Sequence, residues 1–118
     1  MTVILHLLTA PAYAARAELP VVVECPPGSF LHLTAGADVL AQVANTFMLT
    51  TPGEFVVLEV SAERLGPALR WEPPDPPAAP GTAMYGKLFP HLYGPLLREA
   101  VVGVRPAVRA ADGTFLST

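Results

Sequence analysis

LFPHLYGPL, residues 88–96, is a short segment whose backbone is held rigid by two prolines. Pro90 and Pro95 each fix their own φ at about −65° and lack an N–H donor, so the segment cannot be a plain helix or a central strand. If it is extended, Phe89, His91 and Tyr93 point to the same side. We interpret the segment as one wall of a binding site. The structural alternative is an edge strand with a buried tyrosine and a half-exposed histidine.

Short strands and two helices are expected around this segment. Apolar or extended runs predict strands at 2–8, 21–23, 30–33, 55–60, 68–72 and 100–104. One helix is expected at 12–17, with Thr9 as its cap. Apolar residues at helical spacing predict a second helix from 39 to 47, capped by Thr34 or Asp38 and mainly structural in role.

The order of these elements indicates the fold class. Residues 73–81 hold five prolines and no hydrophobic residue larger than alanine, which predicts a loop. Helices and strands do not alternate regularly, as a doubly wound sheet would require. We therefore predict a compact single α+β domain over residues 1–118, with a curved or split mixed β-sheet and two helices in its N-terminal half.

The composition excludes several classes of partner. Of the 118 residues, 52% are hydrophobic and 14% charged, which excludes a disordered chain. A net charge of −3 with a pI near 5.5 gives no reason to expect a nucleic-acid partner. The single cysteine, Cys25, cannot form an internal disulfide, which suits a reducing compartment. With no signal peptide and no membrane span evident, we expect a cytoplasmic protein and leave its oligomeric state open.

All three histidines lie inside or beside short apolar runs: His6, His32 and His91. A polar group within a strand needs a partner, because its desolvation costs free energy. Thr34, two residues after His32, would place its hydroxyl on the same face. We predict that these four side chains and Tyr93 line one pocket for a small-molecule ligand, and separate structural histidines are the alternative. A zinc site is not favoured, because the histidines are 26 and 59 residues apart.

Six motifs follow one another along the chain: Ile4-Leu5-His6-Leu7, Phe30-Leu31-His32-Leu33-Thr34, Val43-Ala44-Asn45-Thr46-Phe47, Val57-Leu58-Glu59-Val60 with Arg64-Leu65, Arg70-Trp71-Glu72, and Phe89-Pro90-His91-Leu92-Tyr93-Gly94-Pro95-Leu96. In this order they resemble a family of small uncharacterised bacterial proteins, domain of unknown function 952, over residues 3–106. The family's second motif usually reads Phe-Ile-His-Cys-Ser-Thr, whereas this chain has Leu33, Thr34 and Ala35 at its last three positions. Leu5 stands where the family commonly has tyrosine.

The resemblance implies a fold like that of the ADP-ribosyltransferase-like superfamily, in which a split β-structure holds the nicotinamide end of NAD. Carried over by position, His6 would hold the ribose or the amide. His32 with Thr34 would supply the contacts of the second strand. A late-strand catalytic Glu has no clear counterpart here, and Glu72 is the nearest acidic candidate.

Two functions are therefore considered. The first is an enzyme, or a relative of one, acting at a nucleotide–ribose bond, with NAD as the candidate cofactor. His91 would then be a general acid or base, and Glu72 the carboxylate near the developing positive charge. The second is a non-catalytic pocket for a nucleotide or similar metabolite, in which Phe89, Tyr93 and Trp71 stack on the ligand. For Trp71 itself we expect a structural, inward-packed position.

Overall fold

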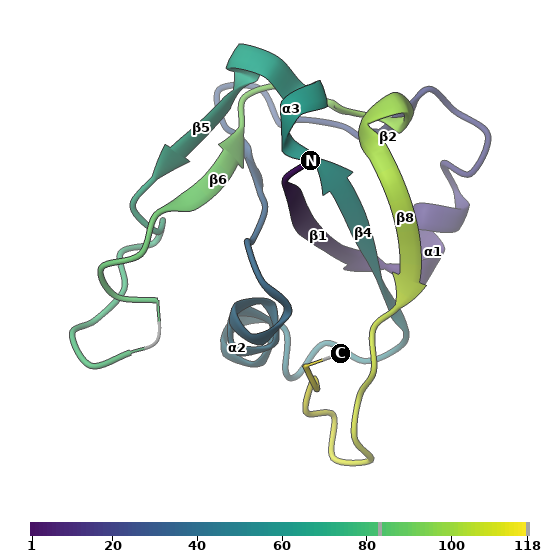
Figure 1. Ribbon diagram of the computed structural model, residues 1–118. Coiled ribbons are helices and arrows are strands. Elements are labelled where there is room, and N and C mark those ends of the chain that lie inside the picture. Colours follow the sequence, from purple (N-terminus) through teal and green to yellow (C-terminus); the bar gives the residue numbers. More distant parts are fainter. Residues whose placement is uncertain (83, 118) are drawn as a thin grey trace.

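In the computed structural model, which describes residues 1–82 and 84–117, the strands form three small antiparallel sheets (Figure 1). The largest has the order β1–β4–β8, with β1 at Val3–Thr9, β4 at Phe55–Ser61 and β8 at Val101–Pro106. A second pairs β2 (Val21–Val23) with β7 (Leu96–Leu97). The third has the order β3–β6–β5, with β3 at Leu31–His32, β6 at Phe89–Leu92 and β5 at Leu69–Glu72. The predicted α+β class with a split sheet is confirmed, and every described strand pair is antiparallel rather than mixed.

Within the described residues, three α-helices connect these strands: α1 (Ala10–Ala14), α2 (Ala37–Phe47) and α3 (Ala62–Leu65). Single 3₁₀ turns follow at Gly66–Ala68 and Arg98–Ala100. Thr9 caps α1 as predicted, because its hydroxyl accepts a hydrogen bond from the backbone N–H of Ala12 at 3.3 Å. The predicted cap of α2 is wrong. Thr34 is paired through its backbone with Leu5, so the chain turns into α2 two residues later, at Gly36, whose φ of 96° favours glycine.

The β1–β4 pair is buried on both faces, which explains why its strands are almost continuously apolar. On one face Ile4 and Leu58 are fully buried, in a core that extends to the two smaller sheets. On the other face Leu5 and Val57 pack against Leu40 of α2. At the end of α2, Ala44, Phe55 and Phe115 form a third apolar cluster. The strand alternation therefore supplies two cores from one pair of strands.

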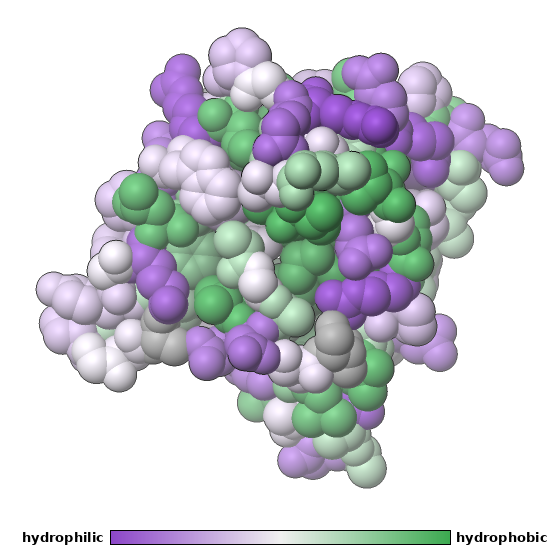
Figure 2. Space-filling model, viewed as in Figure 1, coloured by the Kyte–Doolittle hydropathy of each residue, from purple (hydrophilic) through white to green (hydrophobic). Residues whose placement is uncertain are grey.

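The β5–β6 ribbon diverges from the β1–β4–β8 sheet, and α2 lies below the two (Figure 1). Hydrophobic residues gather near the middle of the same view of the surface, and hydrophilic residues lie along its top (Figure 2). The chain between β5 and β6 has no helix or strand among its described residues, in agreement with the loop predicted at 73–81. None of the helices in the described part of the chain is long and apolar enough to cross a membrane.

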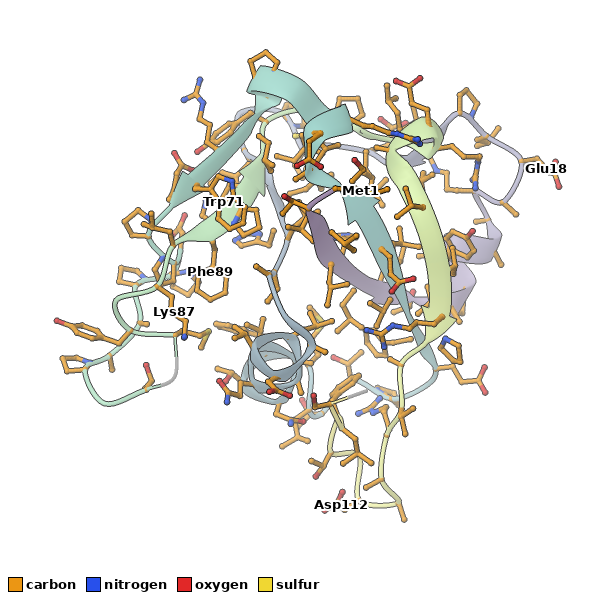
Figure 3. All side chains as sticks on the ribbon, in the orientation of Figure 1. Met1, Glu18, Trp71, Lys87, Phe89 and Asp112 are labelled. Atoms are coloured by element: carbon orange, nitrogen blue, oxygen red, sulfur yellow. The ribbon has the colours of Figure 1, made fainter. Side chains whose placement is uncertain are left out.

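Trp71 is exposed, so the prediction that its indole packs inward is wrong. The side chain lies on β5 and 44% of its surface is accessible (Figure 3). Side chains alternate between the two faces of a strand. Glu72 lies on the face of the β5–β6 pair that carries His91, since the two side chains form a hydrogen bond. Trp71 therefore lies on the other face of β5, which it shares with Leu69. Leu69 packs against the core, whereas Trp71, two residues farther along the strand, is exposed.

Candidate functional site

A cleft of about 340 Å³ opens between β1, β3, α2 and the loop after β5. Its polar lining comes from the predicted residues His6, His32 and Thr34 together with Asp75. Its apolar lining comes largely from one face of α2: Leu40, Val43, Ala44 and Phe47, followed by Met48. A smaller pocket of about 40 Å³ adjoins the cleft, shares His32 and Thr34 with it, and adds His91 and Phe89. We call the cleft and this pocket together the histidine cleft.

Strand register explains why these distant residues meet. His32 of β3 lies directly opposite His91 of β6, and opposed residues of an antiparallel pair share one face. Their ring centroids are 5.4 Å apart. A bridge between Leu5 and Thr34, with two backbone hydrogen bonds, then brings β1 alongside the end of β3. His6 is the residue after Leu5, so it comes to lie within reach of His32.

His91 is buried, with only 2% of its surface exposed, which corrects the alternative of a half-exposed histidine. The expectation that the segment cannot form a central strand is also wrong, because β6 lies between β3 and β5, and Pro90 accepts a hydrogen bond from Leu33 although it cannot donate one.

Nδ1 of His91 donates to Oε1 of Glu72 at 2.9 Å, and the hydroxyl of Tyr93 donates to the same oxygen at 2.6 Å. Arg70 lies directly opposite His91 on β5, and its guanidinium lies 4.7 Å from the centroid of the Tyr93 ring. The carboxylate thus links the imidazole to the phenol and holds both in place.

Phe30 packs into the middle of this arrangement. Its ring stacks on His91 with centroids 4.1 Å apart and an interplanar angle of 23°. It also contacts His32 at 4.9 Å and Tyr93 at 5.1 Å between centroids. Three aromatic contacts of this kind restrict the orientations of the neighbouring rings. The imidazoles of His32 and His91 are therefore positioned by packing as well as by hydrogen bonds.

The other two imidazoles are each held by a backbone oxygen. Nδ1 of His6 donates to the carbonyl oxygen of His32 at 2.8 Å. Nε2 of His32 donates to the carbonyl oxygen of Asp75 at 2.9 Å, which ties the proline-rich loop to β3. The histidines are thus linked in series, since His6 contacts the backbone of His32 and the ring of His32 contacts that of His91.

The charges of the site follow from these contacts. The hydrogen bond from Tyr93, and secondarily that from His91, lowers the pKa of the Glu72 carboxyl, so Glu72 is ionised at neutral pH. The same hydrogen bond raises the pKa of Tyr93, which stays protonated. Burial lowers the pKa of His6 below its ordinary value of 6.5, and a nearby charge on His32 would lower it further. His6 is therefore a neutral imidazole at pH 7.

The structure does not bring every predicted residue into the cleft. His6, His32, Thr34, Phe89 and His91 line the cleft or its adjoining pocket. Phe89, on β6, lies on the side of that strand toward α2 (Figure 3).

Glu72 and Tyr93 are not among the residues lining either pocket. They lie behind His91, where Glu72 holds its ring. Glu72 can therefore orient His91, and it is not placed to touch a ligand in the cleft.

Sequence reasoning missed three contributors to the site. Phe30 is two residues before His32, and that spacing places both on one face of an extended segment. Asp75 comes from the proline-rich loop, where no pattern signals a contact with β3. The prediction that the helix around Val43 and Phe47 is mainly structural is also incomplete. Both side chains line the cleft, and 51% of Phe47 is exposed.

Among residues 1–82 and 84–117, no three His, Cys, Asp or Glu side chains are arranged to hold a metal ion.

Comparison with known proteins supports the sequence resemblance. A family model described as a protein of unknown function (DUF952) matches residues 13–104. The crystal structure of protein CC0527 from Caulobacter crescentus is similar, with a TM-score of 0.75 and 28% identity over 98% of this chain and 94% of that one. The solution NMR structure of CC0527 gives a TM-score of 0.69 and 31% identity over 96% of this chain and 90% of that one. No curated protein matches the sequence significantly.

Proposed function

Because the chain belongs to the DUF952 family, whose description names no activity, we propose a function from its site: the histidine cleft binds the nicotinamide–ribose end of NAD or of a related nucleotide. The observation that carries the proposal is the meeting of His6, His32 and Thr34 in one cleft, beside the buried His91. The resemblance to the ADP-ribosyltransferase-like superfamily gives the same positions to the residues that hold this end of NAD.

The size and lining of the cleft suit such a ligand. Small-molecule sites typically have about 300 to 1,000 Å³, are largely apolar and carry a few polar groups, and the volume of about 340 Å³ lies at the lower end of that range. A planar heterocycle would pack against Val43 and Phe47 of α2. The hydroxyl groups of the ribose would then form hydrogen bonds with His6, His32 and Thr34.

Glycosyl transfer is the second candidate, and the Tyr93–Glu72–His91 chain of hydrogen bonds favours it. In such a step the bond between ribose C1′ and the nicotinamide nitrogen breaks, and its electron pair leaves with nicotinamide. The oxygen of an acceptor hydroxyl forms the new bond to C1′, and its proton passes to Nε2 of His91. Since Glu72 lines neither pocket, it would act by orienting His91. Among the described residues, no carboxylate other than that of Asp75 lines the site to stabilise the positive charge on the ribose, so we expect binding to dominate over turnover.

Calorimetric titration of the purified protein with NAD tests the proposal. We expect saturable binding at one site, and His32→Ala should weaken it at least about tenfold, which corresponds to about 1.4 kcal/mol. Trp71→Ala is the matched control, because Trp71 is an exposed aromatic outside both pockets, and its affinity should equal that of the wild type. Absence of binding by NAD, ADP-ribose and nicotinamide alike would refute the proposed function.

Release of nicotinamide, followed by chromatography, tests the second candidate on the same samples. We expect slow release or none from the wild type. Robust release that is abolished in Glu72→Gln would instead establish an enzyme, because that substitution keeps the shape of the side chain and removes its charge.

A further inference from the structure

Each of the three imidazoles in the histidine cleft is anchored through one ring nitrogen to an oxygen that can only accept a hydrogen bond. The pairs are Nδ1 of His6 with the His32 carbonyl at 2.8 Å, Nε2 of His32 with the Asp75 carbonyl at 2.9 Å, and Nδ1 of His91 with the Glu72 carboxylate at 2.9 Å. The anchored nitrogen must therefore carry the hydrogen. In a neutral imidazole the other nitrogen is then a hydrogen-bond acceptor.

These second nitrogens are free for a ligand. Within the described residues, Nε2 of His6, Nδ1 of His32 and Nε2 of His91 have no hydrogen-bond partner. Burial keeps His6 neutral at pH 7 by lowering its pKa, so its free nitrogen is a lone-pair acceptor there. The anchor of each ring fixes its tautomer. In all three rings the nitrogen that carries the hydrogen donates to a protein oxygen, and the other nitrogen is the acceptor.

The lining of the cleft has no positive side chain to match a phosphate. Neither the cleft nor the adjoining pocket is lined by a lysine or an arginine, among the residues that the structure describes. The single charged residue in the lining is Asp75, which is acidic. Phosphate groups are typically held by arginine, lysine or the N-terminus of a helix, and a carboxylate repels them.

We propose that the histidine cleft is an array of hydrogen-bond acceptors that binds the nucleoside portion of its ligand, through hydroxyl and amide donors, and leaves the phosphates outside. This inference rests on the proposed function, since it names the part of the nucleotide that the site recognises. It makes the substrate class a nucleoside, with any phosphate groups projecting into solvent.

Titration calorimetry with two matched pairs tests the inference: nicotinamide riboside against its mononucleotide, and adenosine against adenosine monophosphate. We expect the affinity of at least one nucleoside to lie within about threefold of the affinity of its monophosphate, because a phosphate in solvent contributes little to binding. Inorganic phosphate should not compete, and raising the salt concentration should leave the affinity almost unchanged. His32→Phe, which keeps a ring and removes the acceptor, should weaken binding at least about tenfold.

The outcomes separate the two proposals. If a monophosphate binds and its nucleoside does not, or if inorganic phosphate competes, the cleft recognises phosphate and this inference is wrong, while the proposed function stands. If neither the nucleosides, the monophosphates nor NAD bind, the proposed function fails and this inference fails with it.

Discussion

The histidine cleft and the surroundings of Arg109 are both clusters of polar groups beside an apolar core. They differ in how many of their hydrogen-bonding atoms are already used by partners within the protein. Arg109 donates from Nε to Gly113, from Nη1 to Thr51 and Gly53, and from Nη2 to Leu49, always to backbone carbonyl oxygens at 2.7 to 3.0 Å. Four of the five N–H donors of a guanidinium are used in this way. In the histidine cleft each ring uses one of its two nitrogens.

The aromatic rings near the two clusters have correspondingly different roles. The guanidinium of Arg109 lies 4.3 Å from the ring centroid of Phe115 and 5.6 Å from that of Phe55, and we call this assembly the Arg109 cluster. It closes the C-terminal hairpin onto the turn after α2. In the cleft, the ring of Phe30 fixes two imidazoles whose remaining nitrogens are unused. A cluster whose donors are nearly all used within the protein stabilises the fold, whereas a cluster with unused hydrogen-bonding atoms next to a cavity is able to bind a ligand.

The largest expected effect separates the two clusters by stability. Arg109→Ala removes four hydrogen bonds from a charged donor and two cation–π contacts, so the free energy of unfolding should fall by about 2 to 4 kcal/mol. Urea denaturation measures this change. Ligand affinity of the molecules that remain folded should not change. Arg109→Lys is the control, and it should recover less than half of the loss, because a lysine lacks the planar fork.

A smaller effect is expected when the orientation of His91 is loosened. Glu72→Gln retains an acceptor for His91 but removes the charge, so ligand affinity should fall by about five- to tenfold with the fold intact. Tyr93→Phe removes only the second hydrogen bond to Glu72, and affinity should change by less than about twofold. Equal losses in the two variants would contradict the role of Glu72 as the residue that positions His91.

The pH dependence of stability distinguishes the clusters through His6, whose pKa is lowered by burial. Because burial lowers the pKa of His6 in the folded protein, the unfolded chain takes up a proton first, and stability should decrease as the pH falls below 6.5. Glu72, whose folded pKa is lowered by the hydrogen bond from Tyr93, should lose its contribution progressively as the pH falls below 4.5. Denaturation of wild type and His6→Gln across this range should show the first decrease only in the wild type.

The smallest effect is expected outside both clusters. Trp71 is exposed on an edge strand, so Trp71→Ala should change the free energy of unfolding by less than about 1 kcal/mol and leave ligand affinity unaltered. A loss of more than about 2 kcal/mol in the free energy of unfolding, measured by thermal or chemical denaturation, would instead show that Trp71 packs inward, as the sequence predicted.

The sequence predicted the parts of the fold that depend on local pattern. The runs that became β1 and β4 are apolar on both faces, and their type was readable because both faces are buried. The cap of α1 at Thr9 and the end of α2 at Phe47 were also predicted from local sequence patterns. The six motifs also placed the chain in its family, which the family match over residues 13–104 confirms.

The arrangement of the site depends on pairings that no local pattern shows. β3 has only two residues, and its register against β6, which sets His32 opposite His91, is fixed by tertiary contacts. The contact of Asp75 with His32 arises from a proline-rich loop without periodicity. Trp71 was misplaced because a large aromatic usually packs inward, whereas here Leu69, on the same face of β5, packs against the core and Trp71 lies beyond it. The sequence singled out the three histidines as candidates, and the structure shows which nitrogen of each has no partner among the described residues.

The most direct test is an NMR measurement of the histidine tautomers, using long-range ¹H–¹⁵N correlations at neutral pH with and without NAD. The account predicts a single tautomer for each ring, with hydrogen on Nδ1 in His6 and His91 and on Nε2 in His32. Added NAD should shift the ¹⁵N signals of the free nitrogens, which are Nε2 in His6 and His91 and Nδ1 in His32. The Nε signal of Arg109 should stay unchanged. Rings that average both tautomers, or free nitrogens that do not respond to NAD or to any nucleoside, would contradict the claim that the histidine cleft is a ligand site.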